Sequence, residues 1–166
     1  MLRWSLVLLW LMVIFAFSAQ TADQSSTTSG STIRFLLNLF YPPYGDLTAP
    51  AQAALVAALS HLVRKLAHGL VFSLLGLLLM GAALTDFPPR KALLLSLLLG
   101  YVAAGLDEMH QILVPGRSGE LLDMLIDFGG VCFGTGIRLL LHSLKERRQK
   151  KKQARHEPVT VPSTTP

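Results

Sequence analysis

Apolar residues in this chain of 166 residues come in four long blocks, and charged residues lie between the blocks or at the C-terminus. The blocks cover residues 4–19, 66–84, 92–106 and 121–142. As a helix, the block 66–84 is about 28 Å long, close to the roughly 30 Å hydrocarbon core of a bilayer. The pattern therefore predicts an all-α, polytopic membrane protein with four transmembrane helices.

The first block allows two interpretations. It follows a lone cation, Arg3, and reaches only about 24 Å as a helix, so it also fits a signal peptide. Ala16 and Ser18 would then occupy the small-residue positions of a cleavage site. Trp4 and Trp10 are unusual in a signal core and favour an uncleaved first helix. Under either interpretation, the next segment lies outside the cell.

The segment before the second block combines polar and interfacial features. Residues 20–32 are rich in Ser and Thr and contain no apolar run, which predicts an exposed loop. Two prolines within residues 41–45 indicate a turn. Thr48 suits a helix N-cap, with Pro50 in the first turn. The leucines that follow at helical spacing predict an extracytoplasmic, interfacial helix before the second span.

The third block ends early at two acids. Residues 92–106 give only about 22 Å of helix before Asp107 and Glu108. Continuing the helix to Val114 supplies the missing length. The two acids therefore lie in the outer hydrocarbon zone or line a recess walled by protein.

Charge adds orientation to this picture. Charged residues make up 15% of the chain, and seven of the 15 Lys and Arg residues lie within residues 145–155, after the last apolar block. Such a terminal run indicates a cytoplasmic anchor on anionic membrane lipids and argues against nucleic acid. Together with Arg3, Arg90 and Lys91, it predicts a plasma-membrane protein with both termini in the cytoplasm. We expect a transmembrane domain over residues 1–145 and a basic, disordered tail over 146–166.

With this topology, many ionisable and polar side chains gather at the outer face. They are Arg64, Lys65, His68, Asp107, Glu108, His110, Gln111, Arg117, Glu120, Asp123 and Asp127. A charge at mid-bilayer costs about 2.5–3.5 kcal/mol on insertion scales, so these groups must pair, protonate or face water. One interpretation is a salt-bridge network that holds the helices together. The other is a polar pocket for the head group of a ligand.

The order of these motifs resembles the VanZ-like family over nearly the whole chain apart from the tail. The matching segments are Ser18 with the Ser-rich loop, Lys65-x-x-His68, Asp107-Glu108-x-x-Gln111, Pro115-Gly116-Arg117 and Asp123-x-x-x-Asp127-x-x-Gly130-x-x-x-Gly134. Asp127 stands where many members of that family carry Asn. The founding relative is associated with low-level teicoplanin resistance. The resemblance therefore implies events at the outer leaflet that involve cell-wall precursors.

The first functional hypothesis is a non-enzymatic protein that binds a lipid-linked or glycopeptide-like ligand and modulates teicoplanin susceptibility. Arg64, Lys65 and Arg117 would hold an anionic group, and nearby acids would orient these cations. The predicted ligand-binding residues are Arg64, Lys65, His68, Asp107, Glu108, Gln111, Arg117, Asp123 and Asp127.

The second hypothesis is an intramembrane enzyme acting on a lipid-linked phosphate or glycan. His68 would be its general base, oriented by Asp107 or Glu108, or these groups would hold a metal. The sequence contains no metalloprotease, serine-hydrolase or phosphate-loop motif. We therefore predict no metal, no cofactor and, on balance, no enzymatic activity.

The third hypothesis is a transporter or a helix-associating scaffold. Gly130 and Gly134 have the spacing that lets helices approach closely, which would suit an oligomer. The carboxylates lie only in the outer half of the spans, and this distribution argues against a relay through the membrane.

Overall fold

The computed structural model describes residues 1–117 and 119–156, and every regular element in these ranges is a helix. The elements are α1 (Leu2–Ser18), α2 (Ala22–Phe40), the short 3-10 helix η1 (Pro42–Asp46), α3 (Ala49–Asp86), α4 (Pro89–Ile112) and α5 (Leu121–His156). The protein is therefore an all-α, polytopic membrane protein, as the sequence predicts.

Helices α3, α4 and α5 are each long and apolar enough to cross a membrane. The first predicted span, α1, has 17 residues and qualifies only together with α2, to which it is bent by 102°. The described residues therefore provide three spans, or four if the bent pair counts as one. Val7 and Ile14 of α1 are buried in the same apolar core as Phe72 of α3 and Ala104 of α4. Helix α1 thus belongs to the bundle.

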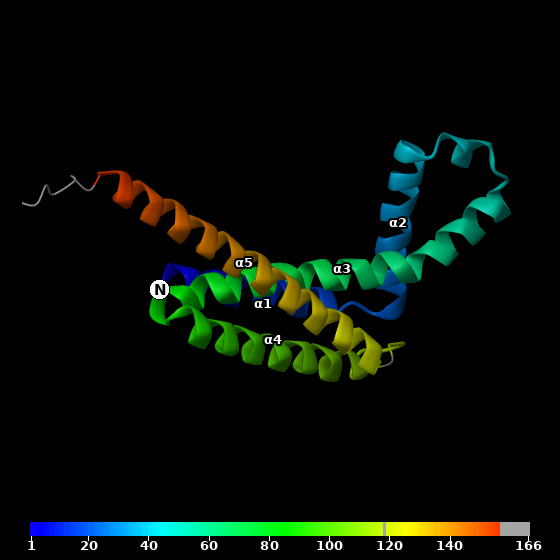
Figure 1. Ribbon diagram of the computed structural model, residues 1–166. Coiled ribbons are helices and arrows are strands. Elements are labelled where there is room, and N and C mark those ends of the chain that lie inside the picture. The colour runs from blue at the N-terminus through cyan, green and yellow to red at the C-terminus, as the bar shows by residue number, and fades with distance from the viewer. Residues whose placement is uncertain (118, 157–166) are drawn as a thin grey trace, which may run out of the picture.

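The closest helix pair is α3 and α5, which cross in the middle of the bundle (Figure 1). Gly130 and Gly134 of α5 lie against the backbone of α3 at Gly69 and Ser73. A Cβ atom at either glycine would approach these backbone atoms to less than 3.0 Å. The predicted close approach is therefore made within one chain, and α3 covers the glycine face that the sequence suggested for an oligomer.

The prediction of an exposed loop over residues 20–32 is wrong, because this segment forms the first part of α2. Thr21 and Gln24 form a reciprocal capping box at its start. The hydroxyl groups of Thr27, Thr28, Ser31 and Thr32 donate to the carbonyl oxygens four residues earlier. Ser and Thr side chains that form hydrogen bonds to the helix backbone in this way are compatible with a helix and do not require a loop. Buried Ile33 then packs near Val56 and fixes α2 beside α3.

The predicted interfacial helix is the first part of α3 and not a separate element. Helix α3 begins after the N-cap Thr48, has Pro50 in its first turn as predicted, and runs without a break for 38 residues. No side-chain hydrogen bond caps it. Its first turns extend away from the bundle, and η1 links them to α2 (Figure 1).

One end of the bundle collects the N-terminus, the α3–α4 turn and the extension of α5 (Figure 1). Arg3 Nη1 donates to the carbonyl oxygen of Gly81 at 3.0 Å, and Trp4 Nε1 donates to Asp86 Oδ2 at 2.8 Å. The α1–α2 and α4–α5 connections lie at the opposite end. The expected disordered tail is helical as far as His156, and residues 157–166 lie outside the described residues.

Candidate functional site

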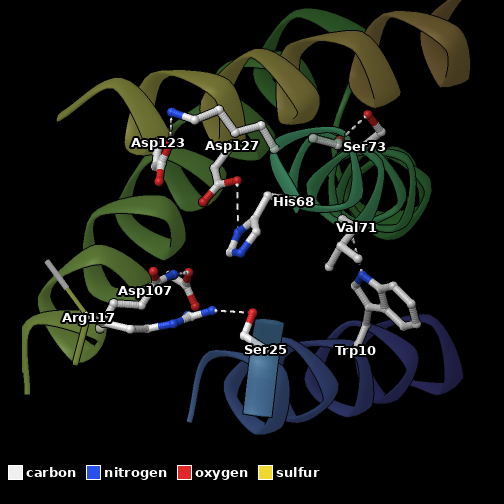
Figure 2. Close-up of polar contacts among 12 residues, drawn as sticks. Trp10, Ser25, His68, Val71, Ser73, Asp107, Arg117, Asp123 and Asp127 are labelled. Atoms are coloured by element: carbon white, nitrogen blue, oxygen red, sulfur yellow. Dashed lines mark hydrogen bonds and ion pairs between the residues drawn. The ribbon is translucent and has the colours of Figure 1, made fainter. Parts of the chain in front are cut away.

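Three helices bring together a histidine and two acids, which we call the acid–histidine cluster. His68 comes from α3, Asp107 from α4 and Asp127 from α5 (Figure 2). One side-chain nitrogen or oxygen from each lies within 4.8 Å of the others. Asp107 is 6% exposed and Asp127 is fully buried. Polar groups from three helices thus converge as the sequence suggested.

The cluster is held by few hydrogen bonds. Gln111, one turn after Asp107, donates from Nε2 to Asp107 Oδ2 at 2.6 Å. His68 Nδ1 lies 3.5 Å from Asp127 Oδ1, which is too long for a strong hydrogen bond. Both carboxylate oxygens of Asp127 are buried, and neither has a hydrogen-bond partner among the described residues.

A cavity of about 220 Å³ lies beside the cluster, with His68 and Asp107 in its wall. Arg64 and Arg117 also line it, and their guanidinium groups donate to serines of α2. Arg64 Nη2 lies 3.0 Å from the hydroxyl of Ser26, and Arg117 Nη2 lies 3.1 Å from that of Ser25. The apolar part of the lining comes from α1 and α3.

Both guanidinium groups keep donors that the described part of the chain does not use. Arg64 Nε and Arg117 Nη1 are buried and have no hydrogen-bond partner there. Burial lowers the pKa of Arg117, which lies in the α4–α5 connection, and the charge of Arg64 lowers it further. Two cations with unused, buried donors beside one cavity favour an anion, because a negative charge would accept from these donors and reduce the repulsion between the two arginines.

The remaining predicted site residues form a separate group. Lys65 Nζ lies 2.7 Å from Asp123 Oδ1 and 3.5 Å from Glu120 Oε2. Glu108 Oε1 accepts a short hydrogen bond from the backbone N–H of Glu120. Lys65, Glu108 and Asp123 are not among the residues that line the cavity. The structure thus brings Arg64, His68, Asp107 and Arg117 to the cavity, with Gln111 and Asp127 behind them.

Comparison with protein families supports the resemblance noted from the motifs. Residues 3–142 match the family model described as VanZ/LLP1, from the start of α1 into α5. The chain belongs to the VanZ/LLP1 family. Searches of curated proteins and of solved structures found no match.

In this VanZ/LLP1 chain, the polar wall contributed by α2 was not predicted as part of the site. Ser25, Thr28, Ser29 and Thr32 line the cavity together with Ser18 of α1. Their spacing of three, four and seven residues is that of one helical face. Reading the Ser- and Thr-rich segment for helical periodicity would have revealed this wall.

A second, larger cavity of about 620 Å³ lies between α1, α3 and α4. Its walls are almost entirely apolar, and Trp4, Leu11 and Leu79 contribute to them. Ile14 and Asp107 line both cavities, so the two spaces are neighbours. The cavity lined by the two arginines and the hydroxyl groups of α2 therefore adjoins a second cavity that is almost entirely apolar.

Proposed function

We propose that this VanZ/LLP1 protein binds an anionic, lipid-linked ligand at the outer face of the plasma membrane. The main support for this proposal is the pair of buried donors without hydrogen-bond partners among the described residues, one on Arg64 and one on Arg117, beside one cavity. Arginine is suited to phosphate and carboxylate groups because its planar fork donates two parallel hydrogen bonds. The hydroxyl groups of Thr28 and Thr32 already donate within α2, so their oxygens would accept from sugar hydroxyl groups, while Ser29 would donate to a phosphate oxygen.

The apolar cavity supports a ligand that carries a lipid tail. It adjoins the first cavity at Ile14 and Asp107, so one amphiphilic molecule could place its head group beside the arginines of the first cavity and part of its tail in the second. Its volume of about 620 Å³ lies within the usual range for small-molecule sites. A soluble anion would have no use for this second space.

The proposed orientation places the cavity at the outer leaflet and both termini in the cytoplasm. The N-terminus, the α3–α4 turn and the basic end of α5 gather at the end of the bundle opposite the α1–α2 and α4–α5 connections (Figure 1). Arg3 belongs to the first of these segments, and Arg90 and Lys91 follow the α3–α4 turn. An excess of Lys and Arg is typical of cytoplasmic segments. Cell-wall lipid precursors exposed at the outer leaflet have the required chemistry, and binding them would alter teicoplanin susceptibility.

The test is direct binding of a long-chain polyprenyl phosphate to the purified protein, measured by native mass spectrometry. The matched polyprenol of equal chain length is the control ligand. Each charge-assisted hydrogen bond contributes about 1.5–3 kcal/mol, so Arg64→Gln or Arg117→Gln should weaken binding about tenfold to a hundredfold. Arg34→Gln, at an exposed position of α2, is the matched control and should bind normally.

Equal retention of polyprenol and polyprenyl phosphate would contradict the proposal, as would equal binding by all three arginine variants. Teicoplanin susceptibility is a separate readout in cells. The proposal expects the protein to change the inhibitory concentration of teicoplanin and expects Arg117→Gln to abolish that change at equal protein abundance. Equal susceptibility with and without the protein would remove this part alone.

An intramembrane enzyme is the second candidate, and one observation favours it. His68 lines the cavity and has Asp127 at 3.5 Å behind it, the arrangement of a base oriented by an acid. The orienting acid would thus be Asp127, not Glu108, which contacts the Glu120 backbone. Release of inorganic phosphate from a polyprenyl phosphate or diphosphate by the wild type, and its loss in His68→Ala, would establish this activity.

A further inference from the structure

The carboxylate of Asp127 is buried without hydrogen bonds to the described part of the chain that would offset the cost of removing it from water. It lies on α5 opposite His68 of α3, fully buried, and both oxygens lack hydrogen-bond partners in the described ranges. A buried carboxylate is costly unless it is paired and hydrogen-bonded or coordinates a metal. His68 at 3.5 Å is the nearest candidate partner, and it does not complete a hydrogen bond.

The surroundings of Asp127 have the composition of a metal site. One imidazole and two carboxylates from three different helices offer ligand atoms within 4.8 Å of one another. Ligand atoms bound at about 2.1 Å to one ion lie about 3.0–4.2 Å apart. None of the present separations exceeds 4.8 Å, so side-chain movement of at most about 1 Å would bring all three ligand atoms into this range around an ion.

A second polar residue orients the cluster. Gln111 Nε2 donates to Asp107 Oδ2 at 2.6 Å and thereby fixes the plane of that carboxylate. Residues that hold a ligand in this way are typical of metal sites. Gln111 is itself buried, so its amide is not there to contact solvent.

We propose that His68, Asp107 and Asp127 bind one divalent cation, with Zn²⁺ or Mn²⁺ as the best match. A mixed set of imidazole and carboxylate ligands suits these ions. The two carboxylates balance the charge of the ion, and His68 and Asp107 face the cavity, which leaves a coordination position open toward it. This inference reverses the absence of a metal predicted from the sequence. It does not depend on the ligand proposed above.

Metal content of the purified, full-length protein tests the proposal without any lipid ligand. The protein is stripped with a chelator, incubated with Zn²⁺ or Mn²⁺, freed of excess metal and analysed for metal per chain. We expect one ion per chain in the wild type. Loss of a residue that only orients a metal ligand typically lowers metal affinity about 10- to 100-fold. Asp127→Asn and His68→Gln remove ligands themselves, so each should lower the affinity by more than that. Asp46→Asn, at an exposed carboxylate in η1, should bind like the wild type.

A variant that fails to fold is recognised by its elution profile in size-exclusion chromatography. If Asp127→Asn or His68→Gln fails in this way, the metal affinity of Gln111→Leu tests the proposal instead. This change removes only the hydrogen bond to Asp107 and should weaken metal binding about 10- to 100-fold. A saturating metal concentration should raise the melting temperature of the wild type and not that of Asp127→Asn. A wild type without stoichiometric metal overturns the proposal and leaves a His68–Asp127 ion pair as the explanation. Wild-type affinity in folded Asp127→Asn or in Gln111→Leu also overturns it.

Discussion

The packing of α3 against α5 positions the acid–histidine cluster, and Gly134→Ala is its most sensitive probe. A Cβ atom at this position would meet the carbonyl group of Ser73 and the nitrogen of Leu77 at less than 3.0 Å. These are backbone atoms, so no side-chain rotation relieves the clash, and the helices must separate. Gly136→Ala is the matched control, because a Cβ atom there meets nothing within 4 Å.

The two substitutions should change the free energy of unfolding in opposite directions. Overpacking a tight contact costs about 1–3 kcal/mol, and backbone contacts belong at the upper end. Replacing a glycine by alanine in an open helical position stabilises by about 0.5–1 kcal/mol. We therefore expect Gly134→Ala to be about 2–4 kcal/mol less stable than Gly136→Ala.

Reversible unfolding in mixed detergent micelles measures this difference, with the wild type as reference. Helix α3 carries His68 and α5 carries Asp127, so a larger distance between the two helices disturbs the acid–histidine cluster beside the cavity. Gly134→Ala should therefore also weaken binding of polyprenyl phosphate. Equal unfolding free energies for the two alanine variants would refute the proposed close contact between α3 and α5.

Three further predictions concern the surroundings of the site. Lys65→Met should leave the melting temperature close to that of the wild type, because solvent screens the salt bridge between Lys65 and Asp123, and it should leave binding of polyprenyl phosphate unchanged. A tenfold loss of that binding would instead put Lys65 in the site. Ile33→Ala should cost about 2–5 kcal/mol and weaken that binding, because buried Ile33 holds the polar wall of α2 against α3; unchanged binding would show that this wall is dispensable. After replacement of the native cysteine, Asp46→Cys should react with an impermeant maleimide on intact cells and Arg90→Cys only after permeabilisation, and the reverse pattern would invert the topology.

Much of the arrangement could be predicted from the order of apolar and charged residues. The lengths of the apolar blocks gave the spans, and the Pro88–Pro89 pair gave the sharp turn between α3 and α4. The alternation of spans also brought His68, Asp107 and Asp127 to a common depth. Depth along the membrane follows from chain order, so the convergence of these residues was accessible without coordinates.

The rotation of each helix about its own axis could not be predicted from the sequence in the same way. Lys65 and His68 are less than one turn apart, yet Lys65 pairs with Asp123 outside the cavity and His68 lines it. Only the packing of α3 on α5, set by the glycines, decides which side faces inward. Helix α2 was missed because Ser and Thr favour loops unless their hydroxyl groups bond back along the helix, as they do here.

Photo-crosslinking tests the central claim most directly: an anionic head group lies between Arg64 and Arg117, next to the acid–histidine cluster. The purified protein in lipid nanodiscs is irradiated with a polyprenyl phosphate that carries a diazirine near the phosphate, and the labelled peptides are mapped. The account predicts labels around His68 and Arg117 that an excess of unlabelled polyprenyl phosphate removes and an excess of polyprenol does not. Labels spread over the outward faces of the helices, or labels that polyprenol removes equally well, would contradict it.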